Sequence, residues 1–244
     1  KLSNGTYMPL DPTWVPFCRE LWSSAEQQQN YLPGVPEGSD LCITPVSAPE
    51  NHYVRIKADN RLDADGTLRG TFTLTAEGQS DSNIRRIFTT GFQSEWKSTM
   101  ERQLLAISPK ARLLSVDYGK NPKYYQAAPI KITFRYEIPD YALRGEGEMF
   151  FRPMVMNNLY NQVRSYMWID TSVENRKYGF KDGCSRLVEL DETIQLPAGY
   201  KLVSAAKDET MQGVGADFEG SLVQKGNKVL LHNRLALKKR VYEA

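Results

Sequence analysis

The residues best suited to covalent chemistry in this sequence are three cysteines and two histidines. Cys18, Cys42 and Cys184 could act as nucleophiles, and His52 and His232 are the histidines that could serve as a base. The cysteine count is odd and no pair has Cys-x-x-Cys spacing, so the sequence supports neither a zinc site nor a complete disulfide framework. A single disulfide between Cys18 and Cys42 stays an open alternative.

Both histidines lie in segments with a strand pattern. His52 is in "ENHYVRIKA" and His232 is in "VLLHNRLAL", where apolar and polar residues alternate. This alternation predicts that each histidine is a polar side chain on the solvent face of a strand. We therefore expect no self-contained Cys-His-Asp enzyme within these 244 residues.

The segment "DADGT" at residues 63–67 resembles the start of a calcium-binding loop. It lacks the downstream ligands and the glutamate that complete such a loop. Because alternating strands flank it, a tight β-hairpin is the better interpretation. We predict no metal ion and no other cofactor.

The composition is that of a folded chain. Of the 244 residues, 41% are hydrophobic, and 31 Lys and Arg against 29 Asp and Glu give a net charge of +2. This small charge makes nucleic acid an unexpected partner. No apolar run approaches the roughly 18 residues of a membrane helix, so we expect no membrane span.

The residue pattern of the sequence changes near residue 50. Residues 1–49 contain seven prolines, which suits an extended connector, and residues 50–244 alternate as β-strands do. The clearest strand segments are "YVRIKA", "LRGTFTLTA", "IKITFRYEI", "RLVELDETIQLPAGYKLVSA" with a Pro-Ala-Gly turn between two strands, and "ADFEGSLVQKGNKVLLHNRLAL" folded at 225–227. This pattern predicts a mainly β protein, an antiparallel β-sandwich.

One segment has a helical period. From residue 84, large apolar residues recur every fourth position, at Ile84, Phe88, Phe92, Trp96, Met100 and Leu104. This spacing predicts a single amphipathic helix over about 82–106 that packs its apolar stripe on the sheet. Arg85 and Lys97 lie off the stripe, and we expect Trp96 to be buried.

The C-terminal half carries a resemblance. The stretch "NRKYGFKDGCSRLVELDETIQLPAGYKLVS", followed by a hairpin and "NRLALKKRVYEA", resembles the C-terminal β-domain of bacterial multidomain transglutaminase-like proteins. In these proteins a β-rich N-terminal domain and a papain-like transglutaminase core precede that domain. The resemblance implies that residues 50–244 are the β-domain.

The N-terminal segment fits the same family. Tyr7, residues 10–13 ("LDPT") and residues 31–34 ("YLPG") stand in the order found at the end of the family's core. The resemblance implies that residues 1–49 are a Pro-rich remnant of that core, and that Asp11 is the third member of a Cys-His-Asp triad. The cysteine and histidine would precede Lys1. The alternative for Asp11 is an Asp-Pro turn at a strand end.

The resemblance also implies a function. The chain would be a non-catalytic C-terminal region that positions substrate or shields the core, in a protein of the periplasm or cell envelope. Its partners would be the missing core and N-terminal domain, and a protein or peptide substrate. The alternative is an independent binding module for a surface glycan or protein, with exposed aromatic side chains among Tyr124, Tyr125, Tyr160, Tyr166 and Trp168.

The connector is unusually apolar for a linker. Its large apolar side chains are Trp14, Phe17, Leu21, Trp22, Tyr31, Leu32 and Leu41. We predict that they pack along the β-domain or contact a neighbouring chain, because several such side chains would otherwise stay in water.

Overall fold

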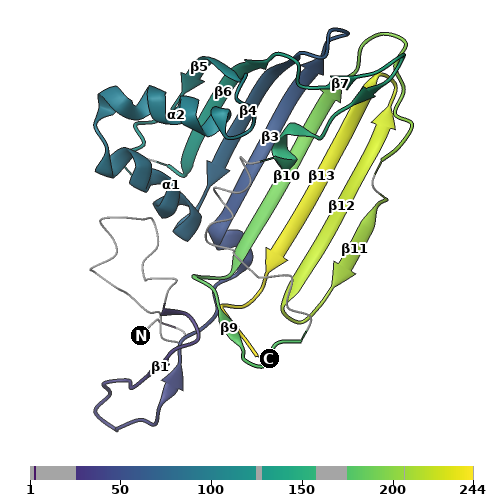
Figure 1. Cartoon of the computed structure of the whole chain (residues 1–244). Coiled ribbons are helices and arrows are strands. Elements are labelled where there is room, and N and C mark those ends of the chain that lie inside the picture. Colours follow the sequence, from purple (N-terminus) through teal and green to yellow (C-terminus); the bar gives the residue numbers. More distant parts are fainter. Residues whose placement is uncertain (1–2, 4–25, 125–127, 158–174, 206, 244) are drawn as a thin grey trace.

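The computed structural model describes residue 3 and residues 26–124, 128–157, 175–205 and 207–243 (Figure 1). Its main element is one sheet of eight strands in the order β11-β12-β13-β10-β3-β4-β6-β5. The strands are β3 (Tyr53–Leu62), β4 (Leu68–Ala76), β5 (Arg112–Asp117), β6 (Ile130–Ile138), β10 (Arg186–Gln195), β11 (Glu209–Gln212), β12 (Ala216–Lys225) and β13 (Lys228–Leu237). All neighbours are antiparallel except β3 and β10, which run parallel.

The described residues also form three two-stranded ribbons and the 3-10 helices η2, η3 and η4. The ribbons pair β1 (Asn30–Tyr31) with β2 (Cys42–Ile43), β7 (Leu143–Arg144) with β8 (Met149–Phe150), and β9 (Phe180–Lys181) with β14 (Val241–Tyr242). The 3-10 helices are η2 (Pro49–His52), η3 (Gln93–Glu95) and η4 (Met154–Met156).

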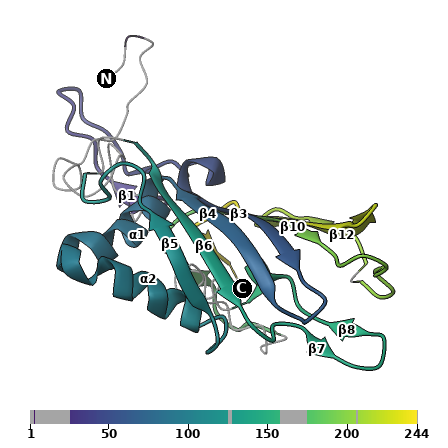
Figure 2. The same cartoon turned by 90° about the horizontal axis from the view of Figure 1, so that it is seen from above.

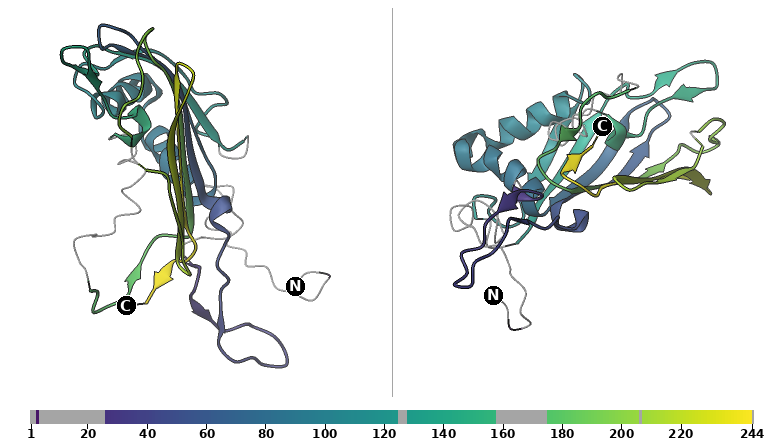
Figure 3. Two further views of the ribbon diagram at one scale, coloured as in Figure 1. Left: turned by 90° about the vertical axis from the view of Figure 1, so that its right-hand side faces the viewer. Right: turned by 90° about the horizontal axis from the view of Figure 1, so that it is seen from below.

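The predicted alternation is confirmed in the central strands. In β4, Leu68, Phe72 and Leu74 are buried, whereas Thr71 and Thr73 point to the opposite side. We call the side with the buried residues the inner face and the other side the outer face. The two α-helices lie against the inner face, as the edge-on view in Figure 3 shows.

The helical layer consists of two helices instead of one. Helix α1 (Gly78–Thr90) and helix α2 (Trp96–Leu105) both lie on the inner face (Figure 2). Gly91 and Phe92 between them have extended backbone, with ψ of 162° and 144°. This break turns Phe92 out of the predicted stripe, and its side chain is 76% exposed.

The rest of the stripe packs as predicted. Phe88, Trp96, Met100 and Leu104 are buried. The Trp96 ring lies 5.1 Å from the Phe88 ring and 5.5 Å from the Tyr118 ring, both in edge-on geometry. The stripe is therefore core, and it joins α1 and α2 to the segment after β5.

One residue placed off the stripe by the sequence is buried. Arg85 was expected on the solvent side, but it pairs with buried Asp81 one helical turn earlier. Its guanidinium also donates to the carbonyls of Pro122 at 3.0 Å and Ala128 at 2.5 Å. The prediction was wrong because the loop before β6 folds over this position, which helical spacing does not reveal.

The sheet has two distinct ends. Strands β3 and β10 begin, and β4 and β13 end, where the chain arrives from residues 26–49; we call this the connector end (Figure 1). The opposite end, where β3 and β10 finish, is the distal end. The ribbon β9–β14 lies near the connector end and the ribbon β7–β8 near the distal end.

The mainly β, antiparallel class with a packed helical element is confirmed. Over the described ranges, the layer that faces the eight-stranded sheet is formed by α1, α2 and the segment 141–157, not by a second large sheet. The reason is that the long strands β10, β12 and β13 join the same sheet as β3, because β10 pairs with β3 and with β13.

The apolar side chains of the described part of the connector are not packed on the domain. Leu32 is 66% exposed, and Tyr31 and Leu41 are also exposed. Trp14, Phe17, Leu21 and Trp22 lie outside the described residues. For Tyr31, Leu32 and Leu41, the first alternative, packing along the β-domain, was wrong, because the ribbon β1–β2 extends away from it (Figure 1); contact with a neighbouring chain stays a prediction.

Candidate functional site

A groove of about 820 Å³ lies at the distal end of the inner face. The sheet contributes Leu62, Leu222 and Val229. One flank comes from residues 147–151 and Pro153, and the other from residues 196–204. The volume lies in the range of small-molecule and peptide sites.

The groove is apolar and part of its lining faces solvent. Met149, Phe151 and Leu202 pack against the core, whereas Phe150 is 60% exposed and Val203 is 91% exposed. Large apolar side chains exposed beside a hollow are typical of interaction sites.

One flank of the groove differs from its predicted structure. The Pro-Ala-Gly turn is present, since Tyr200 N–H donates to the Pro197 carbonyl at 3.2 Å and Gly199 has a φ of 84°. The second strand expected after this turn is not formed. Residues 201–205 belong to no sheet, although the turn before them predicted a strand at this position.

The backbone of this flank is almost unpaired. Leu202 N–H donates to the Gln224 side chain at 2.7 Å. The N–H groups of Lys201, Val203, Ser204 and Ala205 donate to no acceptor in the described part of the chain. Four free donors therefore lie next to an apolar groove.

The buried carboxylate of Glu192 is hydrogen-bonded to the backbone just after the flank formed by residues 147–151 and Pro153. Glu192 on β10 accepts hydrogen bonds from Asn60 Nδ2 at 2.7 Å and from Val155 N–H in η4 at 3.0 Å. Tyr136 Oη donates to Asn60 Oδ1 at 2.5 Å. Burial raises the pKa of Glu192, and these hydrogen bonds oppose the rise.

Sequence reasoning did not identify this network, although a signal existed. Glu192 is in phase with the buried Val188, Leu190 and Ile194, and Asn60 has the same phase as buried residues of β3. Gly70 on β4 leaves room for Asn60, because a Cβ there would lie 2.0 Å from Asn60 Oδ1. A polar residue at an apolar position of a strand is thus the clue to such a network.

The connector end contains a second buried polar cluster, built around His52. The prediction that His52 lies on a solvent face was wrong, because its side chain is fully buried. Its Nδ1 accepts from Gln79 N–H at 3.3 Å, and its Nε2 lies 3.3 Å from Gln27 Nε2. Gly78, with a φ of 59°, permits this approach, since a Cβ would lie 2.4 Å from His52 Nδ1.

Burial sets the charge of His52. Desolvation, together with a smaller effect of the nearby Arg186 guanidinium, lowers the pKa of its imidazole from 6.5 to about 4. The imidazole is neutral at pH 7, so His52 is a packed structural group at that pH.

Gln27 lies at the centre of this cluster. Its side-chain Oε1 accepts from Ser47 N–H at 3.1 Å and from Ser185 Oγ at 3.3 Å, and its backbone carbonyl accepts from Arg240 Nη1 at 2.8 Å. Gln27 is fully buried. These bonds tie the connector to β10 and to the C-terminal segment.

Gln28 adds two further contacts. Its Oε1 accepts from the N–H groups of Arg240 at 2.7 Å and Val241 at 2.9 Å. The residue has a φ of 53°, a left-handed conformation that non-glycine residues adopt rarely. We call Gln27 and Gln28 the glutamine anchor.

His232 lies where the sequence predicted. It is on the outer face, partly exposed, with its Nδ1 2.7 Å from Asp191 Oδ1 on β10. The pair matches the β10–β13 register, in which Asp191 stands opposite His232. The structure does not bring a described cysteine into this pair, since Cys42 is in β2 and Cys184 is buried.

The remaining predicted residues fall on both sides of the described boundary. Asp11 and Cys18 lie outside the described residues, whereas Cys42 is a free thiol and Cys184 is buried with its Sγ 3.5 Å from Arg186 Nη2. Among the aromatic candidates, Tyr124 is exposed, and Tyr125, Tyr160, Tyr166 and Trp168 also lie outside the described residues.

The hairpin prediction for residues 63–67 is confirmed. Thr67 N–H donates to Asp65 Oδ1 at 2.9 Å, which lowers the pKa of Asp65. Asp63 pairs with Arg61 and Arg69. No group of three or more potential metal ligands occurs over the ranges that the structure describes.

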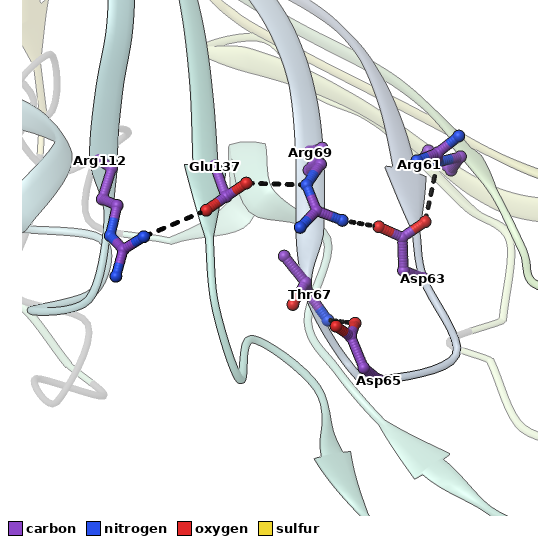
Figure 4. Close-up of polar contacts among 7 residues, drawn as sticks. All are labelled: Arg61, Asp63, Asp65, Thr67, Arg69, Arg112 and Glu137. Atoms are coloured by element: carbon purple, nitrogen blue, oxygen red, sulfur yellow. Dashed lines mark hydrogen bonds and ion pairs between the residues drawn. The ribbon is translucent and has the colours of Figure 1, made fainter.

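These pairs belong to an exposed ion-pair ladder across the distal end of the outer face (Figure 4). Arg69 also donates to Glu137 at 2.8 Å, and Arg112 lies 3.4 Å from the same carboxylate. Each carboxylate is shared by two arginines; the arginine side chains are largely exposed, and the carboxylates of Asp63 and Glu137 are partly exposed. Such pairs contribute little to stability, and we read the ladder as a solvated strand face.

The fold and the groove define the chain as a mainly β domain with one large mixed sheet and a candidate binding site at its distal end. Residues 147–244 match the model of a family described as "Domain of Unknown Function with solved-structure structure (DUF3858)". No curated protein matches the chain, and no solved structure matches it. The matched span includes both flanks of the groove.

No described helix is both long and apolar enough to cross a membrane.

Proposed function

We propose that this chain is the non-catalytic C-terminal region of a bacterial transglutaminase-like protein of the cell envelope. In that protein it holds the cysteine-dependent core in a fixed position relative to the β-domain, and Asp11 completes the core's triad. The glutamine anchor carries this proposal, because it fixes the connector to the domain by buried hydrogen bonds.

The chemistry of the anchor supports a rigid joint. Gln27 has partners in η2, in the segments before η2 and β10, and beside β14. A buried amide that loses its partners costs about 1 to 3 kcal/mol. The connector therefore leaves the domain in one direction, as positioning of a neighbouring domain requires.

The anchor is tested by replacing Gln27 with Leu. This variant keeps the bulk of the side chain and removes its hydrogen bonds, so residues 29–49 should become accessible to protease while the sheet stays folded. The matched control is Gln93→Ala, an exposed glutamine of η3. Equal cleavage of both variants and the original chain would contradict a rigid joint.

A separate experiment tests the proposal that this chain by itself has no catalytic activity. The isolated chain should neither release ammonia from glutamine peptides nor cleave peptides. Rapid stoichiometric labelling of Cys18 at neutral pH, lost on replacing His52, would contradict the proposal. In the natural gene, the segment upstream of Lys1 should encode a cysteine and a histidine at core spacing.

A second function, an independent binding module for a surface glycan or protein, is favoured by a different observation. The groove at the distal end is apolar, and Phe150 and Val203 beside it are exposed. The two functions are compatible, because the groove and the anchor lie at opposite ends of the sheet.

A further inference from the structure

We infer that the distal groove binds an extended apolar peptide, which adds a strand along residues 201–205. The inference rests on the binding-module function and names the ligand class for it. It does not depend on the positioning role of the glutamine anchor.

The first argument is the conflict between sequence and structure on one flank. Residues 200–205 follow a turn that is present and were predicted to form a strand, yet the segment 201–205 has no strand partner among the described residues. A segment with strand propensity and free backbone donors is a template for a further strand. The chain keeps it unpaired at the rim of an apolar groove.

The second argument is the arrangement of apolar side chains. An added strand would present every second side chain to the groove, where Leu62, Leu222 and Val229 of the sheet lie. Phe150 and Val203 at the rim would lose solvent contact. The groove thus accepts alternating apolar side chains of a chain several residues long.

The third argument excludes an acyl chain as the preferred occupant. A hydrocarbon that covered the groove would remove water from the N–H groups of Val203 and Ala205, which alternate with the Leu202 N–H bonded to Gln224, without replacing it by an acceptor. An unpaired buried donor is costly. An extended peptide offers carbonyl oxygens to these donors and apolar side chains to the groove.

The charged residues at the rim of the groove suit a peptide that carries a positive charge near one end and a negative charge near the other. Glu148 lies on one flank of the groove and Lys201 on the other. A peptide with an apolar centre and charged flanking residues complements both groups.

The test starts from phage-displayed random ten-residue peptides selected on the full chain. Selected peptides should have alternating apolar residues, and their affinity should fall at least about tenfold for Val203→Asp and for Phe150→Asp. Val214→Asp is the matched control, because Val214 is an exposed valine that does not line the groove. Failure to select any peptide that depends on Val203 would overturn the inference.

Backbone methylation of a selected peptide tests strand pairing directly. Alternate amides of an edge strand point toward its partner, so N-methylation of one alternating set should abolish binding and methylation of the other should leave it within about threefold. Equal tolerance of both sets would overturn strand addition, since side chains alone would then account for the affinity.

Three further arms distinguish the other occupants. Dodecanoate that displaces the peptide and binds more tightly would identify an acyl site and overturn the inference. Self-association of the chain that is lost in Val203→Asp would identify a second copy as the occupant, with the same consequence. If a glycan found on an array binds the chain but not the Phe150→Asp variant, the inference of a peptide ligand is overturned. The binding-module function would still hold.

Discussion

At the connector end of the sheet, polar side chains are buried and hydrogen-bonded, whereas at the distal end apolar side chains and backbone donors face solvent. Gln27, His52 and Arg186 are buried at the first end. Phe150 and Val203 are exposed at the second. Hydrogen bonds offset the cost of burying the polar groups at the first end, whereas exposed apolar side chains beside a hollow, as at the second end, are typical of an interaction site.

The difference indicates which end is complete. At the connector end the chain supplies its own partners from residues far apart in sequence, as in the bond between Arg240 and Gln27. At the distal end the described residues supply the groove but leave the backbone of one flank unpaired. The connector end is therefore complete within this chain, and we propose that the distal end binds a ligand.

Replacing the Trp96 side chain is expected to have the largest effect on stability, and the other effects are compared with it. Trp96 is buried against Phe88 and Tyr118, so Trp96→Ala should lower the free energy of unfolding by about 3 to 5 kcal/mol. Urea denaturation measures the effect. Lys97→Ala is the neighbouring control, and equal effects of the two changes would mean that the stripe is not a core face.

Breaking the buried ion pair between Asp81 and Arg85, near the connector end, should lower the free energy of unfolding by a similar amount. Asp81→Ala leaves the Arg85 guanidinium buried without its carboxylate and removes the acceptor of Ile130 N–H at 3.0 Å, so we expect a loss of about 3 to 5 kcal/mol. Glu101→Ala is the control, because its pair with Lys97 is exposed and 3.9 Å long. A loss below about 1 kcal/mol for Asp81→Ala would mean that this end is not held by buried polar contacts.

Acid should weaken the connector end. The pKa of His52 is lowered from 6.5 to about 4 in the folded state, so the unfolded chain binds more protons between these values. Stability contributed by neutral His52 is present above pH 6.5 and is lost as the pH falls toward 4, by at most about 3 kcal/mol. Urea denaturation across this range should show the loss, and His52→Gln should reduce the slope. An unchanged slope in His52→Gln would contradict the assignment.

Glu192, near the distal end, should have the opposite pH dependence. Burial raises its pKa above 4.5, so the folded state binds the extra proton and stability falls as the pH rises through this region. Glu192→Gln should reduce that fall, measured as unfolding free energy against pH. If the variant instead steepens the fall, the carboxylate is stabilised in its charged form by its hydrogen bonds with Asn60 and Val155.

The smallest effect is expected at the rim of the groove. Val203 is almost fully exposed, so Val203→Asp should change the free energy of unfolding by less than about 0.5 kcal/mol. Thermal unfolding of the isolated chain measures it. A large loss would show that Val203 is packed in solution and that the distal end is already complete.

The sequence alone predicted the strands and the chemistry of their two faces. Alternation placed Leu68, Phe72 and Leu74 on the buried side of β4, and the turn residues near 65 and 226 marked two hairpins. It also predicted the burial of Trp96. These features depend on contacts between neighbouring residues or on a fixed period, which the sequence displays directly.

Tertiary structure alone decided the layers, the groove and the buried polar clusters. The parallel pairing of β10 with β3 merged the strands into one sheet, and no local pattern encodes a pairing between segments about 130 residues apart. His52 was predicted on a solvent face and is buried, because Gln27, Gln79 and the close approach at Gly78 enclose it. Periodicity shows that a side chain leaves one face of a strand, but which distant segment covers that face depends on how the whole chain folds.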